Sequence, residues 1–225
     1  MSLQDKLDAF RTSLESGGPP YNAPDWIHEP MHRATLELVD SGIARKVLKT
    51  GDKAPAFTLN NADGHSISST ELLAQGPLVV TFYRGVWCPY CNIELQAIEE
   101  ALPEILRRGA KLVAISPQTG PYSVRAQSEN KLSFPILSDP HNAVAARFGL
   151  RFRLPDYLAD LYKIVFKNDL AVVNDDPSWT LPMPARYVLA QDGTIVYSEF
   201  SEDYTCRPDH QEMIPILSKI WEARK

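Results

Sequence analysis

The sequence predicts an α/β domain with a central mixed β-sheet flanked by helices, and a helical extension in front of it. The first observation is an apolar, β-branched run over residues 78–83, followed by a helical pattern over 92–108 and a second apolar run over 111–115. Strand, helix and strand in this order predict a parallel βαβ unit. The second is a pair of strand-like runs, 186–189 and 194–197, on either side of Asp192-Gly193, which predicts an antiparallel hairpin.

Size and charge limit the classes of protein to consider. With 225 residues and 44% hydrophobic composition, the chain is long enough for one sizeable core, so we expect one main domain. The net charge of -5 gives no basic excess, and we expect neither nucleic acid nor a membrane as a partner. Charged residues interrupt the first 14 positions, and no apolar stretch reaches membrane-spanning length. We therefore expect a soluble, cytoplasmic protein.

The first 50 residues read as a helical extension. Leu3, Leu7, Phe10 and Leu14 recur at helical spacing after Ser2, and the pattern stops at the glycines and prolines of 17–20. A second helical stretch follows over 32–39. We expect residues 1–50 to pack on the main domain or on a partner chain, and residues 51–225 to form that domain.

The main domain begins with a short strand at 57–59, a turn at 62–65 and a helix start at 68–71. After the βαβ unit, a helix can follow Pro121, and residues 134–137 predict a short, edge-like strand because they contain a proline. A helix is expected over 142–148. Residues 150–180 read as an irregular insertion with a helical segment near 157–166, and residues 210–221 as a closing helix.

Two of the three cysteines form a C-x-x-C pair at the point where the first buried strand leads into its helix. Cys88 falls at the end of the strand and turn, and Cys91 in the first helical turn. Free N–H groups and a partial positive charge at a helix N-terminus favour a thiolate. Cys88 should therefore be the more acidic, attacking sulfur, with Cys91 in reach to form a disulfide with it. Pro89 suits the first helical turn, where its missing N–H is not needed.

Two other interpretations of this pair remain. The cysteines could be structural thiols, or Cys206 and His210 could complete a Cys3His zinc site with them. Zinc pairs usually lie on knuckle-like turns and not between a buried strand and a long helix, so the sequence favours redox chemistry.

Several segments together resemble the peroxiredoxin-like proteins of the AhpC/TSA group, in the thioredoxin superfamily. The similarity covers about residues 51–217 and rests on residues 51–59, 82–91, 114–116, 134–139 and 184–193. It implies a thioredoxin-like, peroxiredoxin-type fold. The tetrad Cys88-Pro89-Tyr90-Cys91 is also that of glutaredoxins, and Trp87 before it is similar to thioredoxin.

The chain departs from the family pattern at two places. A typical peroxiredoxin has Thr or Ser three residues before its peroxide-reacting cysteine, where this chain has Gly85. The family's arginine after the insertion has Pro184 in its place, with Arg186 two residues later. Pro184 is similar to the thioredoxin proline, which is cis and packs against the disulfide.

The resemblance also suggests roles around the two cysteines. Arg84 and Arg186 are expected near the Cys88 thiolate, where either could polarise a peroxide oxygen. Glu94 could relay a proton to Cys91, as in TlpA-like reductases. Trp87 and Tyr90 are expected to shape the rim of the site and a docking surface for a partner thiol protein.

The leading hypothesis is a thiol-dependent peroxidase that reduces hydrogen peroxide or alkyl hydroperoxides through a Cys88 sulfenic acid and a Cys88–Cys91 disulfide. Thioredoxin or glutathione would regenerate the thiols, no cofactor is expected, and the family implies a homodimer. The alternative is a protein disulfide reductase without peroxidase activity, which the two departures favour. A zinc-bound interaction module is the third hypothesis, and Cys206 is otherwise expected to be a bystander thiol.

Overall fold

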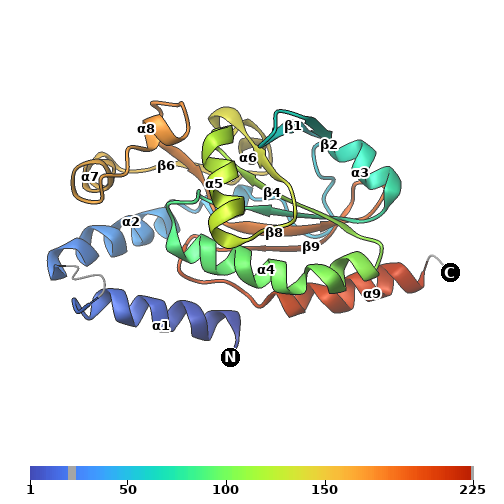
Figure 1. Cartoon of the computed structure of the whole chain (residues 1–225), viewed down its shortest axis with the longest axis horizontal. Coiled ribbons are helices and arrows are strands. Elements are labelled where there is room, and N and C mark those ends of the chain that lie inside the picture. Colours follow the sequence, from blue (N-terminus) through green and yellow to red (C-terminus); the bar gives the residue numbers. More distant parts are fainter. Residues whose placement is uncertain (20–23, 224–225) are drawn as a thin grey trace.

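A computed structural model describes residues 1–19 and 24–223, and its centre is a seven-stranded mixed sheet (Figure 1). The strands lie in the order β2-β1-β5-β4-β3-β8-β9, and a separate pair, β6 and β7, lies beside them. Their bounds are β1 Thr58–Asn61, β2 Ser66–Ser68, β3 Leu78–Phe82, β4 Lys111–Ser116, β5 Ile136–Ser138, β6 Arg151–Arg153, β7 Thr180–Pro182, β8 Ala185–Leu189 and β9 Ile195–Phe200. The predicted thioredoxin-like α/β fold is confirmed.

The strands of the predicted βαβ unit, β3 and β4, lie inside this sheet, and the predicted hairpin forms the edge that ends with β9. Strand β3 pairs in parallel with β4 and antiparallel with β8, which forms the hairpin with β9. Every residue of β3 is buried, as expected for a strand covered on both faces. Its side chains alternate: Val79 faces one core cluster, while Leu78, Val80 and Phe82 face the other. The strand that leads to Cys88 is therefore fixed on both faces.

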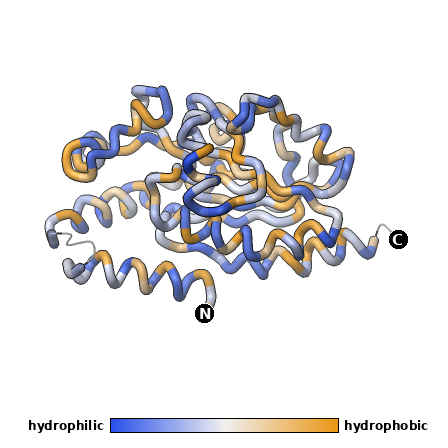
Figure 2. The backbone as a smooth tube through the Cα atoms, in the orientation of Figure 1, coloured by the Kyte–Doolittle hydropathy of each residue, from blue (hydrophilic) through white to orange (hydrophobic). Residues whose placement is uncertain are grey.

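Helices cover both faces of the sheet, and the apolar positions concentrate on the strands between them (Figure 2). The helices α1 (Leu3–Glu15), α4, α5 and α9 contribute to the core cluster on one face, and α3 and α6 to the cluster on the other. In Figure 1 α4 and α9 lie side by side along the sheet. Their bounds are α3 Ser69–Gln75, α4 Pro89–Arg107, α5 Gly120–Asn130, α6 Ala143–Arg147 and α9 Ile214–Glu222.

The N-terminal extension folds back on the domain. Helix α1 (Leu3–Glu15) begins at Ser2 with a capping box that includes Asp5, and its Leu3 and Leu7 are buried in the α4 core cluster. The 3₁₀ helix η1 (Asp25–Ile27) leads into α2 (His28–Asp40), which packs against the insertion. Both helices were predicted, although Pro20 of the predicted stop signal lies outside the described residues.

The predicted insertion contains α7 (Asp156–Asp160), the π-helix η4 (Leu161–Val165) and α8 (Leu170–Val173), held between β6 and β7. Together with α2 it encloses a third apolar cluster around Leu154, Leu158 and Tyr162. Two further short segments are the 3₁₀ helices η2 (Ile43–Lys46) and η5 (His210–Met213).

The prediction of an edge-like strand over residues 134–137 was wrong. Strand β5 begins only at Ile136 and lies inside the sheet, between β1 and β4. The reason is that Pro135 precedes the strand, so its missing N–H removes no bond from the ladder. Its carbonyl even accepts a hydrogen bond from the backbone N–H of Ala114.

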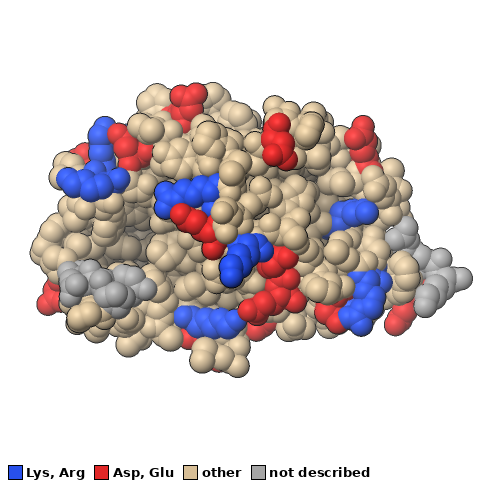
Figure 3. Space-filling view, in the orientation of Figure 1, with Lys and Arg blue, Asp and Glu red and all other residues tan. Residues whose placement is uncertain are grey.

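Charges of both signs are interspersed over the face in Figure 3, without one large patch of either sign. Several are paired along helices, as Arg125 is with Glu129 on α5. Within the described ranges, no helix has the length and apolar character needed to cross a membrane.

Candidate active site

Cys88 and Cys91 lie where the sequence predicts them, at the N-terminus of α4. Cys88 is the N-cap residue, Pro89 is the first helical residue, and Cys91 lies within the first turn. Both are free thiols, and Cys88 is only 1% exposed. The pair is thus a dithiol at the end of a rigid strand, enclosed by the protein.

The two thiols differ strongly in acidity. Burial is the largest influence on Cys88 and opposes its ionisation. It is outweighed by two hydrogen bonds from Cys91, one from its side chain and one from its backbone N–H, together with the charges of Arg84 and Arg207. The net result is a Cys88 pKa lowered to about 6. Burial raises the pKa of Cys91 well above its ordinary value, and the neighbouring Cys88 raises it further. Cys88 is therefore the thiolate near neutral pH and Cys91 the thiol.

Arg84 provides the positive charge beside Cys88. Its side chain is fully enclosed, and its Nη2 donates a 2.8 Å hydrogen bond to the hydroxyl of Tyr162. The guanidinium also lies 4.2 Å from the ring centre of Tyr204 and 4.9 Å from that of Trp87. No carboxylate pairs with it among the described residues, so the Cys88 thiolate is the anion available to balance this buried charge.

Gly85, the first departure from the family pattern, has a structural reason. Its φ of +147° is one that residues with a side chain rarely adopt, and a Cβ atom there would lie 2.4 Å from Nε1 of Trp87. A Thr or Ser does not fit while Trp87 keeps this position. Trp87 is partly buried and packs edge-on against Tyr162, so it belongs to the wall of the site.

Two amide side chains, of the buried Gln118 and the partly buried Asn92, hold the loop that carries Cys88. The Oε1 of Gln118 accepts a hydrogen bond from the backbone N–H of Val86 at 2.8 Å, and the Nδ2 of Asn92 donates to the Val86 carbonyl at 2.7 Å. Gln118 also donates to the hydroxyl of Tyr83. These contacts fix the loop from both sides, as a preorganised nucleophile requires.

The expectation that Tyr90 lies on an exposed rim was wrong. Its side chain is 4% exposed, because Phe10 of α1 packs edge-on at 4.9 Å from its ring and Tyr204 at 5.5 Å. The N-terminal extension therefore covers the surface on which we expected a partner protein to dock.

Glu94 and Arg186 belong to a buried ion network beneath Cys91. The Oε1 of Glu94 lies 3.1 Å from Nη2 of Arg186, and its Oε2 accepts a 2.6 Å hydrogen bond from Nε of Arg207. Arg186 also pairs with Glu199 at 3.1 Å. Glu94 thus lies near Cys91, as predicted. Arg186, which was expected near the Cys88 thiolate, is instead paired with two carboxylates. The arginines whose charges act on the two thiols are Arg84 and Arg207.

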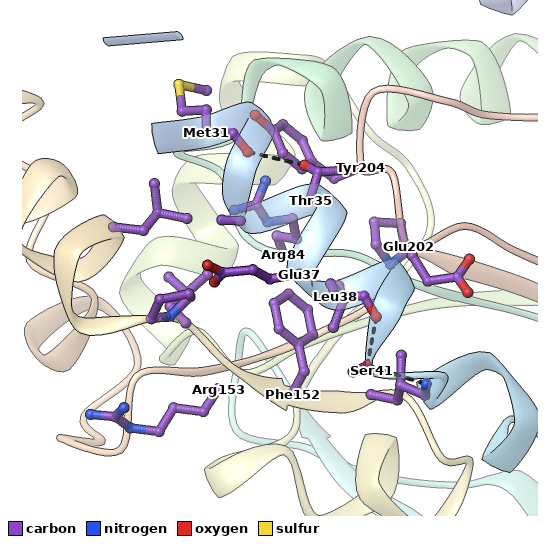
Figure 4. Close-up of a pocket in the computed structure, with 16 residues that line it drawn as sticks. Met31, Thr35, Glu37, Leu38, Ser41, Arg84, Phe152, Arg153, Glu202 and Tyr204 are labelled. Atoms are coloured by element: carbon purple, nitrogen blue, oxygen red, sulfur yellow. Dashed lines mark hydrogen bonds between the residues drawn. The ribbon is translucent and has the colours of Figure 1, made fainter. Parts of the chain in front are cut away.

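Pro184 lines a cavity of about 310 Å³ between α2 and the insertion, together with Arg84 and Tyr204 (Figure 4). Its walls are largely apolar. Figure 4 shows Phe152 pointing across the cavity toward Leu38 of α2, with Arg84 beside Tyr204. The cavity therefore ends at the cation that neighbours Cys88.

Cys206 and His210 do not join the cysteine pair. Within residues 1–19 and 24–223, no three His, Cys, Asp or Glu side chains are grouped to hold a metal ion. The thiol of Cys206 instead donates to Asp203, and His210 contacts Asp209 and Gln211. The proposed zinc set is not assembled.

Sequence reasoning missed four side chains of this site: Gln118, Tyr162, Tyr204 and Arg207. None lies near the cysteine motif in the sequence, and they reach it only through the tertiary fold. Tyr162 was included only as part of an apolar helical segment.

The chain matches the model of the AhpC/TSA family over residues 50–198. Peroxiredoxin Bcp of Escherichia coli (strain K12) is 30% identical over 103 residues, which are 46% of this chain and 65% of Bcp. Peroxiredoxin Q, chloroplastic, of Oryza sativa subsp. japonica is 28% identical over 69% of this chain and 60% of its own length. The chain thus spans less than two thirds of the length of these curated relatives.

Among solved structures, peroxidoxin BcpB from Mycobacterium tuberculosis superposes with a TM-score of 0.60 and 21% identity, over 79% of this chain and 99% of BcpB. At this identity the superposition supports the fold. The family match begins at residue 50, so the two N-terminal helices that cover the site lie outside it.

Proposed function

The chain belongs to the AhpC/TSA family, and on that basis we propose that it is a thiol-dependent peroxidase with Cys88 as the attacking residue and Cys91 as its disulfide partner. The observation that carries this proposal is the pair formed by Cys88 and Arg84, a low-pKa thiol beside a buried cation that has no carboxylate partner among the described residues.

The chemistry balances with two thiols and one peroxide. The Cys88 thiolate attacks the terminal oxygen of the hydroperoxide, the O–O bond breaks, and an alkoxide or hydroxide leaves and takes up a proton. Cys88 becomes a sulfenic acid. The sulfur of Cys91 then attacks the Cys88 sulfur, the S–O bond breaks, and water leaves with the Cys91 proton, which gives the disulfide.

Arg84 can assist the first step in two ways. It favours the thiolate before the attack, and it lies where negative charge develops on the leaving oxygen. Because it is buried among three aromatic rings, its charge is screened by little water and acts strongly at short range.

The cavity between α2 and the insertion is the candidate entry for the peroxide. It reaches Arg84, it has room for a small organic group, and its apolar walls suit an alkyl or aryl hydroperoxide as well as hydrogen peroxide. To reduce the Cys88–Cys91 disulfide, thioredoxin or glutathione has to reach the Cys88 sulfur. Helix α1 and Tyr204, which pack over this part of the site, therefore have to move or leave room for a small thiol.

A protein disulfide reductase is the second candidate. Gly85 and the C-x-x-C tetrad favour it, but the burial of Cys88 and the packing of Phe10 on Tyr90 oppose direct access by a folded protein substrate. Family membership and access therefore favour the peroxidase.

One experiment separates the two functions. The reduced protein receives one equivalent of hydrogen peroxide or of cumene hydroperoxide, and the loss of free thiols is followed in the native protein and in Cys88→Ser. The proposal expects two thiols lost per peroxide, much faster than for a free cysteine, and no fast phase in Cys88→Ser. A native protein that reacts no faster than free cysteine rules out the peroxidase.

A further inference from the structure

Arg207 contacts the sulfur of Cys91, and neither the sequence motif nor the family match includes it. It lies between β9 and η5, beyond residue 198, where the family match ends. Its Nη2 lies 3.9 Å from the Cys91 sulfur, its Nε donates to Glu94, and its Nη1 donates to the carbonyl of Cys206 at 2.7 Å. Three separate partners thus fix one guanidinium, in a residue that is only 4% exposed.

The charges around Cys91 explain why this guanidinium is needed. Glu94 is buried close to the sulfur, and its negative charge disfavours a thiolate at Cys91. Arg207 bridges the two groups and has the opposite effect on Cys91. Without Arg207, a Cys91 thiolate would be buried beside a carboxylate whose remaining cation, Arg186, is shared with Glu199.

The N-terminal extension holds Arg207 in this position. The backbone N–H of Arg207 donates to Oε1 of Gln4 at 2.9 Å, and Nε2 of Gln4 donates to the carbonyl of Thr205 at 3.4 Å. The backbone N–H of Leu3 donates to Asp209 in the same segment. Residues at the start of α1 therefore hold the loop that carries Arg207 on both sides of this residue, at Thr205 and at Asp209.

From this geometry we infer that Arg207 is the catalytic cation of Cys91, holding its sulfur as a thiolate in the two steps in which that sulfur carries negative charge. In the first, the Cys91 thiolate attacks the Cys88 sulfenic acid and hydroxide leaves, taking a proton to become water. In the second, a reductant thiolate attacks Cys88, the S–S bond breaks, and Cys91 leaves with the electron pair. Each sulfur then has its own arginine, Arg84 for Cys88 and Arg207 for Cys91.

The first of these steps rests on the proposed peroxidase function, whereas the second applies to any chemistry of this disulfide. The test therefore has two parts. The first measures Cys91 alone, in protein with Cys88→Ser and Cys206→Ser, through the pH dependence of the carbon-13 shift of its labelled Cβ atom. Arg207→Gln should move the titration of Cys91 to higher pH, and Arg207→Lys should restore part of the shift.

The second part follows the native Cys88 after one equivalent of peroxide. Arg207→Gln should slow disulfide formation about tenfold to a hundredfold, as expected for loss of a charge-assisted contact. The Cys88 sulfenic acid should then accumulate and be captured by dimedone. Arg125→Gln, which removes an exposed arginine paired with Glu129 on α5, is the control and should behave as the native protein.

An unchanged Cys91 titration in Arg207→Gln, or equal rates of disulfide formation, overturns the inference. If Arg207→Gln does not fold, Gln4→Leu replaces it. This change keeps the charge of Arg207 but removes the acceptor of its backbone N–H, so it should also slow disulfide formation. A Gln4→Leu protein that forms the disulfide at the native rate overturns the inference. A native protein that forms no sulfenic acid rules out the peroxidase instead, while the Cys91 titration still tests Arg207.

Discussion

The indole of Trp87 fills the space that a side chain at Gly85 would need, with Nε1 2.4 Å from the position of a Cβ atom. Gly85→Ala should therefore lower the free energy of unfolding by more than the backbone strain of a positive φ alone, which is about 1–3 kcal/mol. Denaturant unfolding measures the loss. Gly64→Ala is the matched control, because Gly64 has a φ of +81° but open space around it. Equal losses at the two glycines would contradict the role of Trp87.

The low pKa of Cys88 predicts how its reaction with peroxide depends on pH. Since the thiolate is the reactive form, the rate should fall as the pH drops through about 6 and reach a plateau above it. Stopped-flow tryptophan fluorescence can follow the reaction, because Trp87 precedes Cys88. A midpoint near 9, the value of an ordinary thiol, would show that the neighbours of Cys88 do not stabilise its thiolate.

Replacement of Arg84 tests the source of that low pKa. Arg84→Met removes the charge, so the midpoint should move to higher pH and the rate at neutral pH should fall about tenfold or more. Arg84→Lys keeps the charge and should retain a lower midpoint, although it loses the flat contact with Tyr204. Identical midpoints in the two variants would mean that the charge is not the cause.

The cavity between α2 and the insertion predicts a selective effect on large peroxides. Leu38→Trp should fill it and lower kcat/KM for cumene hydroperoxide about tenfold, with little change for hydrogen peroxide. Val39→Trp, at an exposed position of the same helix that does not line the cavity, should leave both rates unchanged. A parallel loss for both peroxides in Leu38→Trp would contradict entry through this cavity.

Local patterns in the sequence were sufficient to predict much of the fold. The buried run of β3, the cap at Ser2 and the Asp192-Gly193 turn each depend on neighbouring residues, and all three appear in the structure. The location of Cys88 at the start of α4 was predicted for the same reason. The position of β5 was not, because whether a short strand has one neighbour or two depends on the whole sheet.

The rest of the site depends on long-range contacts that no local pattern encodes. Arg207 lies 116 residues from Cys91 along the chain, and Tyr162 lies 78 residues from Arg84. The contact between Phe10 and Tyr90 brings together two amphipathic helices, α1 and α4, and the pattern of neither helix specifies the other as its partner. The sequence therefore indicated the reacting atoms better than the groups that surround them.

The most direct test of the account is the product that one equivalent of hydrogen peroxide leaves on Cys91→Ser protein. Without Cys91, the sulfenic acid has no partner in the pair and should remain on Cys88. Mass spectrometry should then find a single added oxygen, or a dimedone adduct, at Cys88 within the dead time of mixing. Unmodified Cys88, or oxidation of Cys206 in its place, would contradict the assignment of Cys88 as the residue that reduces peroxide.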